Sequence, residues 1–337
     1  MDVLVLSDAH IRAVLTAADV VATQDHAFLL AADQERVRSA HTHHATFAPD
    51  GMAFVHSAAV QDETGVVIKS GTQHPGNAAL GLPAVQATVT LHDPGTGAPV
   101  AVLNGATITA LRTAGGLVSA ARALALPGPH TVGVLGAGVQ AAEFVRLMCE
   151  LMPVERVLVW SPRLHSGERH LDRRPFGPEA SSPGGRAAGP PVEVAASPAD
   201  LCARSSVIAT CTLSRTPVVE GAWLRPGTTV LTMGSYAPDR RELDLDCARR
   251  AHLTFTDLPA QALRANGPIL EAVEAGVLTP DELRPLAGVL RGDDPGRTGD
   301  DQILIFHGNG LGVQDAVLAW RARTRARAAG MGTMVVL

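Results

Sequence analysis

The chain has 337 residues, of which 46% are apolar and 18% are charged, and its formal net charge is −5. This length predicts two domains, and the mildly acidic balance without a basic stripe argues against nucleic acid as a partner. No uncharged apolar stretch reaches the ~18 residues that a membrane span needs, and the N-terminus lacks the basic region of a signal peptide. The spacings of the four cysteines fit neither a CxxC metal site nor a dense disulfide framework, so we expect a soluble cytoplasmic protein.

The basic residues are almost all arginine: of the 28, only Lys69 is a lysine. A lineage that prefers arginine explains the bias in general, but it does not explain why one lysine remains. Lysine is a compact cation whose pKa moves readily on burial, whereas arginine is a planar and permanently charged fork. Lys69 is therefore a candidate for a site that arginine could not serve.

In chain order, the first 35 residues are predicted to be helical, with Asp19 in the first turn of an amphipathic run. Short strands follow between about 52 and 103, with a hairpin-type turn at 92–97. A second helix is expected over 107–126. Pro127-Gly128-Pro129 ends this helix and marks a domain boundary.

Beyond this boundary, continuous apolar strands alternate with helices, as in a parallel sheet that is covered on both faces. The expected strands are 131–135, 156–160, 206–212, 229–233 and 253–256. Residues 164–191 interrupt the alternation with Pro, Gly and Arg and predict a flexible loop. A final helix over 312–327 is expected to pack back on the first domain.

The segment Gly136-Ala-Gly138-Val139-Gln140-Ala141 has the G-x-G-x-x-A form of a dinucleotide-binding turn. It follows one expected strand and opens an expected helix, which makes the motif specific. Gly136 permits the tight turn and Gly138 lets the backbone approach a pyrophosphate. The start of the helix then presents free N–H groups to the phosphates.

The end of the next strand predicts which nucleotide binds. An NAD site usually has Asp or Glu at this place to bind the ribose 2′-OH, but this chain has Ser161-Pro-Arg163. Ser161 could donate a hydrogen bond to a 2′-phosphate and Arg163 could bind it through a charge-assisted fork. We therefore expect NADP(H) to be preferred, with NAD(H) possible.

We further expect cofactor contacts from residues at the ends of later strands and from a late glycine turn. These are Thr210, Thr212, Met233, Gly234 and Gly310.

Several motifs together resemble the ornithine cyclodeaminase/μ-crystallin family. They are K-x(4)-HPGN from Lys69, GLP at 81–83, ALRTA around Arg112, the GAGVQA turn, GS-x-x-PD-x-RELD at 234–244, PGRT at 295–298 and GLGVQD at 310–315. The match extends over nearly the whole chain.

The resemblance implies an α/β fold, with a Rossmann NADP-binding domain inserted into an α+β substrate-binding and dimerisation domain. The first would be residues 128–309 and the second 1–127 plus 310–337. It also implies a homodimer, and it implies that Lys69 and Arg112 face the nicotinamide and hold the carboxylate of an amino or imino acid. Arg112 could grip that carboxylate with two parallel hydrogen bonds, and Lys69 could take part in proton transfer if burial lowers its pKa.

The sequence departs from the family pattern at two places. Ornithine cyclodeaminases carry a catalytic Asp where this chain has Tyr236, and a Tyr supplies no carboxylate near neutral pH. Many members carry an Arg near residue 43, where this chain has His41, His43 and His44. His43 and Tyr236 are therefore expected to contact the substrate, and a metal site is not expected because no Asp, Glu or Cys nearby completes one.

The leading hypothesis is an NADPH-dependent reductase of a small imino acid, such as Δ1-pyrroline-2-carboxylate or a related ketimine. One alternative is an ornithine cyclodeaminase, against which Tyr236 counts. Others are an alanine-type or opine-type dehydrogenase of a biosynthetic pathway, and a non-catalytic binding protein of the μ-crystallin kind.

Overall fold

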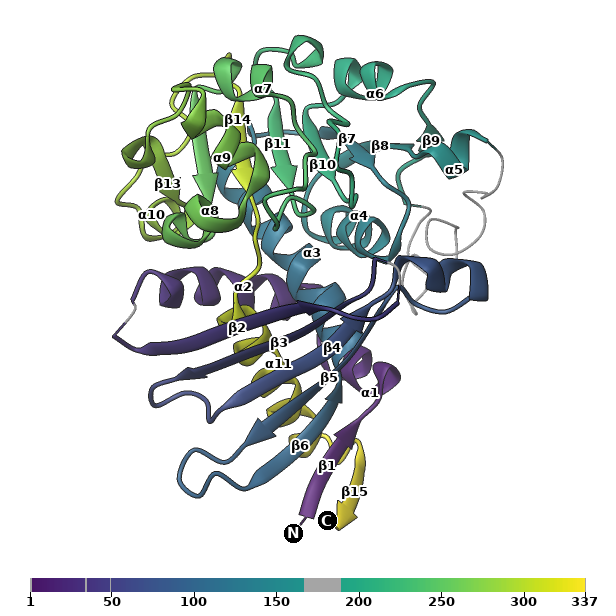
Figure 1. Cartoon of the computed structure of the whole chain (residues 1–337), viewed down its shortest axis with the longest axis vertical. Coiled ribbons are helices and arrows are strands. Elements are labelled where there is room, and N and C mark those ends of the chain that lie inside the picture. The colour runs from purple at the N-terminus through teal and green to yellow at the C-terminus, as the bar shows by residue number, and fades with distance from the viewer. Residues whose placement is uncertain (1, 34, 49, 167–188, 337) are drawn as a thin grey trace. The chain divides into compact units, whose positions relative to one another are not determined.

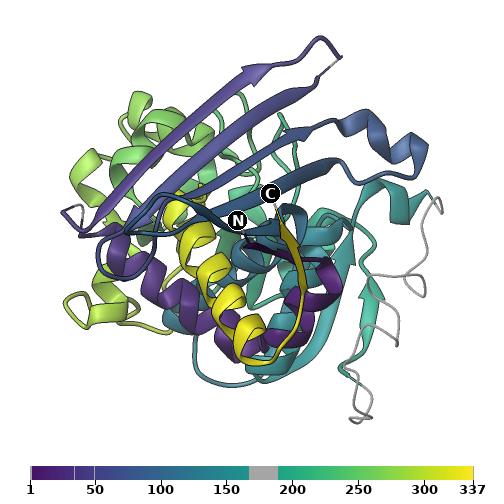
Figure 2. The ribbon, with the colours of Figure 1, turned by 90° about the horizontal axis from the view of Figure 1, so that it is seen from below.

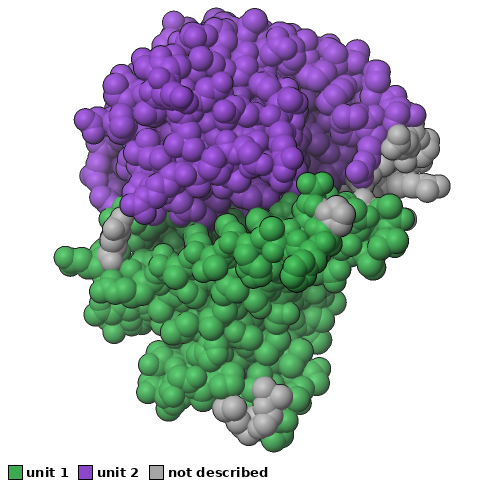
Figure 3. All heavy atoms as spheres, in the orientation of Figure 1, with its two compact units in different colours: residues 1–112, 311–337 green, residues 113–310 purple. Residues whose placement is uncertain are grey.

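The chain folds into two compact units. The computed structural model describes residues 2–33, 35–48, 50–166 and 189–336. Unit 1 combines the residues up to Arg112 with those from Leu311 onward, and unit 2 is the stretch between them (Figure 3). The chain leaves unit 1 within the long helix α3 (Gly105–Leu124) and returns to it at Leu311.

Unit 1 is built on a sheet with strand order β15-β1-β6-β5-β4-β3-β2 (Figure 1). Only β1 and β6 are parallel neighbours, and the other pairs are antiparallel. The strands are β1 (Asp2–Leu6), β2 (Val37–Ala45), β3 (Met52–Val60), β4 (Val67–Gln73), β5 (Val85–His92), β6 (Pro99–Asn104) and β15 (Thr333–Val336). The predicted turn at 92–97 joins β5 to β6.

The helices of unit 1 cover one face of this sheet. They are α1 (Asp8–Val14), α2 (Ala17–Ala31) and α11 (Gly312–Ala328), with a short 3-10 helix η1 (Pro75–Leu80) after β4. Helix α11 packs beside α2 and against strands β2 to β5 (Figure 2). Thr16 and Asp19 cap each other's backbone at the start of α2, which is why that helix begins where it does.

The prediction that residues 1–35 are entirely helical was wrong at its start. Residues 2–6 form β1, which pairs with both β6 and β15. Val3, Leu4 and Leu6 are buried, and a short continuous apolar run such as residues 3–6 suits a strand as well as a helix. The pairing of this segment with β6 and β15 therefore determines that it forms a strand.

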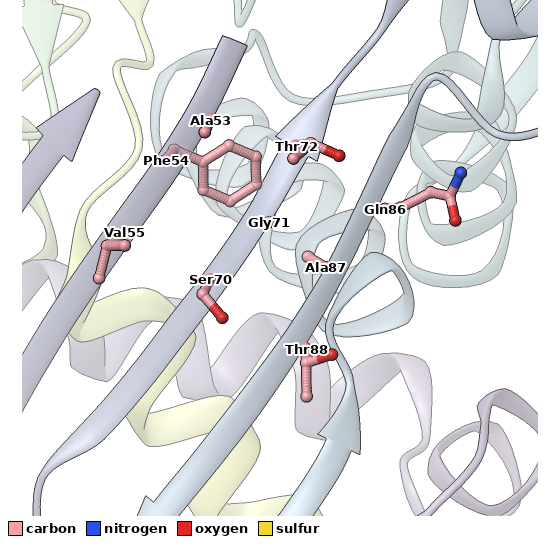
Figure 4. Close-up of a pocket in the computed structure, with 9 residues that line it drawn as sticks. All are labelled: Ala53, Phe54, Val55, Ser70, Gly71, Thr72, Gln86, Ala87 and Thr88. Carbon is pink, nitrogen blue, oxygen red and sulfur yellow. The ribbon is translucent and has the colours of Figure 1, made fainter. Parts of the chain in front are cut away.

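The opposite face of the unit 1 sheet carries no helix within the described residues. Because side chains alternate along a strand, Ser70 lies on this face while its neighbour Lys69 lies on the covered one. Val55 is 40% exposed here. An open depression among β3, β4 and β5 is lined by Val55, Ser70 and Thr88 with their neighbours (Figure 4).

Unit 2 is built on a parallel sheet with strand order β13-β12-β14-β11-β10-β7-β8-β9. The strands are β7 (His130–Leu135), β8 (Val154–Trp160), β9 (Val192–Val194), β10 (Val207–Thr210), β11 (Thr229–Thr232), β12 (Leu253–Thr256), β13 (Leu283–Pro285) and β14 (Leu304–His307). Strands β10, β11 and β14 are buried along their whole length, as expected for a sheet covered on both faces. The strand order reverses between β7 and β10, and nucleotides bind at such a switch point in open parallel sheets.

The helices of unit 2 connect these strands. They are α4 (Val139–Leu151), α5 (Pro162–His165), α6 (Pro198–Arg204), α7 (Leu245–Arg250), α8 (Pro259–Ala265), α9 (Gly267–Glu274) and α10 (Leu286–Arg291), with 3-10 turns η3 (Gly221–Trp223) and η4 (Pro280–Glu282). The predicted loop at 164–191 begins inside α5. Its stretch 167–188 lies outside the described residues.

Candidate active site

The glycine turn of unit 2 joins β7 to α4 at the switch point. Gly136 has a φ of +112°, and a Cβ there would lie 2.5 Å from the carbonyl oxygen of Cys211, which follows β10. Glycine therefore allows the loops after these two neighbouring strands to approach each other. A Cβ on Gly138 would meet nothing within 4 Å, so the space above that residue is open.

The beginning of α4 fits a phosphate group. Gly138 is the N-cap and supplies no side-chain hydrogen bond to the first turn. The first backbone N–H groups of a helix have no intrahelical partner, and together they favour an anion. Val139 is 64% exposed at the first helical position, and Gln140 follows it half-buried. The residues present thus fit a dinucleotide.

Ser161 and Arg163 stand where the ribose of such a nucleotide is expected, directly after β8. Ser161 is the N-cap of α5, and its hydroxyl accepts a hydrogen bond from the Leu164 N–H at 3.2 Å. The hydroxyl proton stays available for donation to a ligand. Arg163 is exposed at the second position of the same short helix, which leaves its guanidinium accessible.

Glu242 is buried and binds the loops that follow β10 and β11. Its carboxyl group accepts hydrogen bonds from the Thr212 N–H at 2.8 Å, the Thr212 hydroxyl at 2.8 Å and the Gly234 N–H at 2.7 Å. Burial raises the Glu242 pKa to about 7, although hydrogen bonds from Thr212 and Gly234 oppose that shift. Four of the predicted cofactor residues, Thr210, Thr212, Met233 and Gly234, lie around this carboxyl group or beside a residue that binds it.

Asp257 plays a similar part for the loop after β14. Its carboxylate accepts hydrogen bonds from the backbone N–H groups of Asn309 at 2.8 Å and Gly310 at 2.7 Å. Gly310 has a φ of +81°, a conformation that favours glycine. The predicted cofactor residue Gly310 is therefore held in a fixed turn within unit 2.

In unit 1, Lys69, Arg112 and Asp315 form a buried cluster on the covered face of the sheet. Lys69 Nζ lies 2.7 Å from Asp315 Oδ2, and Arg112 Nε donates to Asp315 Oδ1 at 3.2 Å. The side chains of Lys69 and Asp315 are each 2% exposed. Within the described residues, the Arg112 Nη groups have no hydrogen-bond partner, so they remain available to a carboxylate.

The surroundings of this cluster shift its proton affinities. Burial lowers the Lys69 pKa to about 8, with Asp315 opposing the shift and Arg112 adding to it. Burial disfavours the Asp315 carboxylate, but Lys69 and Arg112 outweigh it and hold the Asp315 pKa well below its usual range. Lys69 can therefore exchange a proton near neutral pH while Asp315 stays ionised.

Three histidines lie beside this cluster on the same face. His56 is the cross-strand neighbour of both Lys69 and His41. His43 Nε2 lies 3.0 Å from His56 Nε2, and the His41 ring stacks on the His56 ring with centroids 4.4 Å apart. His44 alternates to the open face and has no part in the group.

Phe54 forms the apolar edge of the cluster. Lys69 Nζ lies 5.7 Å from the centre of the Phe54 ring, close enough for a cation–π interaction. A Cβ on Gly71 would come within 2.8 Å of the Phe54 ring. Gly71, the first glycine of the K-S-G-T-Q-H-P-G-N motif, thus leaves room for the Phe54 ring.

Sequence reasoning singled out Lys69, Arg112 and His43, and the structure brings these three to one face of unit 1. It missed Asp315, His56, Glu242 and Asp257. Asp315 ends the GLGVQD motif and Glu242 lies in the RELD motif, so both signals were available. Asp257 and His56 stood in no motif. Tyr236 lies half-buried in the loop after β11, in unit 2.

The described residues contain neither a cluster of metal-ligating side chains nor a membrane-spanning helix. No group of three or more His, Cys, Asp or Glu side chains there could hold a metal ion. No described helix is long and apolar enough to cross a membrane.

The sequence and fold of this chain are similar to those of several known enzymes. Alanine dehydrogenase of Archaeoglobus fulgidus is 30% identical over 275 residues, which cover 80% of this chain and 79% of that protein. Iminosuccinate reductase of Paracoccus denitrificans is 33% identical over 252 residues, covering 75% and 74%. The structure of Thermococcus litoralis Δ1-pyrroline-2-carboxylate reductase in complex with NADH and L-proline aligns with a TM-score of 0.88 at 27% identity, covering 98% of this chain and all of that one.

The model of the ornithine cyclodeaminase/mu-crystallin family matches residues 15–330, which include both the glycine turn and the Lys69–Asp315 cluster. The predicted α/β fold with a Rossmann-type parallel sheet is confirmed by the topology and by the solved relatives. This chain belongs to the ornithine cyclodeaminase/mu-crystallin family.

Proposed function

We propose that this protein is an NADPH-dependent reductase of a small imino acid, such as Δ1-pyrroline-2-carboxylate or a related ketimine. The observation that carries the proposal is the buried pair of cations, Lys69 and Arg112, aligned by one carboxylate in a chain that also has a dinucleotide turn. The names of the relatives, two of which are imine reductases, support the same reaction class.

Three residues of unit 1 have separate roles toward the substrate. Arg112 uses its free Nη groups to bind the substrate carboxylate through two parallel hydrogen bonds, which fixes the α-carbon. Asp315 holds the Arg112 and Lys69 side chains in place through its two oxygens. Lys69, with its pKa near 8, donates the proton that the substrate nitrogen acquires. A bound nicotinamide dinucleotide supplies the hydride for the C=N carbon.

The preference for NADPH rests on the end of β8. Ser161 and Arg163 offer a hydroxyl donor and a guanidinium where an NAD site usually has a carboxylate. A guanidinium binds a 2′-phosphate through a charge-assisted fork, but it gains little from a 2′-hydroxyl.

A related reaction is favoured by one relative. Alanine dehydrogenase suggests the reductive amination of a 2-oxo acid, in which the same imino acid would form from the oxo acid and ammonia. Tyr236 argues against cyclodeamination, because its phenol supplies no carboxylate to activate a side-chain amine near neutral pH.

The test is NADPH oxidation by the purified protein with a panel of cyclic ketimines, and separately with 2-oxo acids plus ammonia. Turnover of cyclic ketimines supports the proposal, and turnover only with 2-oxo acids and ammonia supports the related reaction. Ornithine is added without reductant as a third arm. NADPH binding with no turnover in any arm rejects the proposal in favour of a ligand-binding protein.

The open face of the unit 1 sheet supports a homodimer. It exposes Val55 and carries the depression around Gly71, with no described helix across it. Light scattering on a sizing column should give twice the chain mass for the wild type. Val55→Glu should shift the protein toward the monomer, and a monomeric wild type would reject this assembly.

A further inference from the structure

A row of side chains connects the surface of unit 1 with buried Lys69. It begins at His43, which is exposed, and continues to His56 through the 3.0 Å contact between their Nε2 atoms. His56 Nδ1 lies 3.8 Å from Asp315 Oδ2. The same oxygen lies 2.7 Å from Lys69 Nζ.

The contact between the two Nε2 atoms determines how protons are placed. One of two imidazole nitrogens in a hydrogen bond must donate and the other must accept. Asp315 is an acceptor because Lys69 and Arg112 keep it ionised, so it favours a proton on His56 Nδ1. In neutral His56 the Nε2 atom then accepts, and His43 Nε2 donates.

His56 Nδ1 also lies close to Asp315 without being bonded to it. The atom is buried, and among the described residues it has no hydrogen-bond partner, since 3.8 Å exceeds the ~2.7–3.2 Å of an N–H···O bond. A swing of the ring toward Asp315 would close the gap. The proton on this nitrogen is thus placed one small movement from the oxygen that Lys69 contacts.

His41 holds the ring without joining the row. Its Nε2 accepts a hydrogen bond from the Gly312 N–H at the start of α11, at 3.1 Å. Burial and the neighbouring His56 lower the His41 pKa to about 4, so His41 stays neutral. Its stacked ring fixes the plane in which His56 lies.

We propose that His43 and His56 relay protons between solvent and Lys69 through Asp315, and that they replenish the proton Lys69 delivers. This inference rests on the proposed reductase function. In the reduction, the substrate carbon gains a hydride from NADPH and the nitrogen gains one proton from Lys69.

The relay then restores that proton. His56 Nδ1–H passes its proton through Asp315 Oδ2 to Lys69 Nζ, while His56 Nε2 takes the proton of His43 Nε2–H. His43 Nδ1 takes a proton from water, so one proton enters for each proton used and no charge accumulates. Both rings finish in the opposite tautomer, and exchange of ring protons with water, in which one ring nitrogen loses a proton and the other gains one, restores the starting arrangement.

A different role for His43 was predicted from the sequence, namely contact with the substrate. The two roles differ in the kinetic constant that they govern. A residue that binds substrate affects KM, whereas a relay residue limits the rate of proton delivery and affects kcat.

The first experiment therefore measures kcat and KM for His43→Gln and His56→Gln, with His44→Gln as the matched control on the open face. Glutamine keeps a hydrogen-bonding side chain but cannot pass a proton through a ring. We expect kcat to fall by about 10²-fold in both relay variants, with KM unchanged, and no change in the control. An unchanged kcat in both variants would overturn the relay, and a raised KM alone for His43→Gln would assign that residue to substrate binding.

Added imidazole and solvent deuterium give further readouts. A small base can replace a missing relay ring, so imidazole should restore turnover of His43→Gln at the exposed end. In the relay variants the rate in D₂O should fall more than in the wild type, because proton delivery has become the slow step. A kcat loss that imidazole does not rescue, with an unchanged solvent isotope effect, indicates a merely structural role.

A third readout needs neither substrate nor cofactor. Nitrogen-15 NMR of the free protein should show His56 with its proton on Nδ1 and His43 with its proton on Nε2. His56 protonated only on Nε2 would overturn the relay even if the protein reduces imines. Correct tautomers in a protein that reduces no imine would leave the proton path intact and reject the proposed function alone.

Discussion

In unit 1 the groups proposed to meet a ligand are the ends of long charged side chains, whereas in unit 2 they are mainly backbone N–H groups at glycine turns, together with the side chains of Ser161 and Arg163. Asp315 aligns Lys69 and Arg112 on a sheet face, while Glu242 and Asp257 bind the backbone of three loops. The arrangement in unit 1 orients charged side chains, and the arrangement in unit 2 fixes the conformation of loops. Substitutions in the two units should therefore have their effects in different measurements.

The largest effect is expected at the only lysine. Lys69→Arg should lower kcat by about 10²–10⁴-fold, because arginine stays protonated at all working pH values and cannot donate to the substrate nitrogen. The dissociation constant for NADPH, measured by fluorescence titration, should not change. Lys69→Met, which removes the charge without adding bulk, should behave alike, and near-normal turnover of Lys69→Arg would show that the lysine is dispensable.

The next effect is on the stability of unit 1. Asp315→Asn leaves two buried cations without their shared carboxylate, which should lower the free energy of unfolding by about 3–5 kcal/mol. The Lys69 pKa should fall further, since Asp315 opposes its depression. Denaturant unfolding measures the loss. Asp293→Asn, at an exposed ion pair with Arg291, is the control and should cost less than about 1 kcal/mol.

Glu242 should make the stability of unit 2 depend on pH. Its pKa is raised from 4.5 to about 7 in the fold, so the folded state binds the proton more tightly than the unfolded chain does. Its contribution is fully present below about pH 4.5 and is lost as the pH rises through 7, by at most about 3 kcal/mol. The unfolding free energy of wild type minus that of Glu242→Gln should therefore fall between pH 5 and pH 8, and a flat difference would contradict the assignment.

The smallest effect concerns the choice of nucleotide. Arg163→Ser should weaken NADPH binding by about 10–100-fold, as expected for the loss of a hydrogen bond between charged groups, and should leave NADH binding unchanged. Titration with both cofactors separates the two outcomes. An equal loss for both nucleotides would place Arg163 near the pyrophosphate instead of the ribose.

Much of the fold could be predicted because local patterns and the long-range structure agree. The strands β7, β8, β10, β11 and β12 were all expected from continuous apolar runs, within a few residues of their observed ends. The strands β1, β2, β9, β13, β14 and β15 were missed. Of these, β1 and β15 are short and lie beside each other at the edge of the sheet, so only the pairing of distant segments identifies them.

The site was predictable where chemistry and motif coincide, as at Lys69 and Arg112. It was not predictable where a residue acts through distant partners. His56 lies in no motif, and its importance comes from register, which sets it opposite both His41 and Lys69. Asp315 lies 203 residues after Arg112, and no local pattern could indicate that the two are paired.

This separation has a consequence for how the protein is made. The groups that Asp315 contacts all belong to the first 112 residues, but α11 is synthesised only after the whole of unit 2. At roughly 5–20 residues per second, translating 113–310 takes about 10–40 s. Throughout that time the strands β2 to β5 lack the helix that covers them, and Lys69 lacks its counter-ion. The packing of the first segment is therefore completed only after α11 has been synthesised.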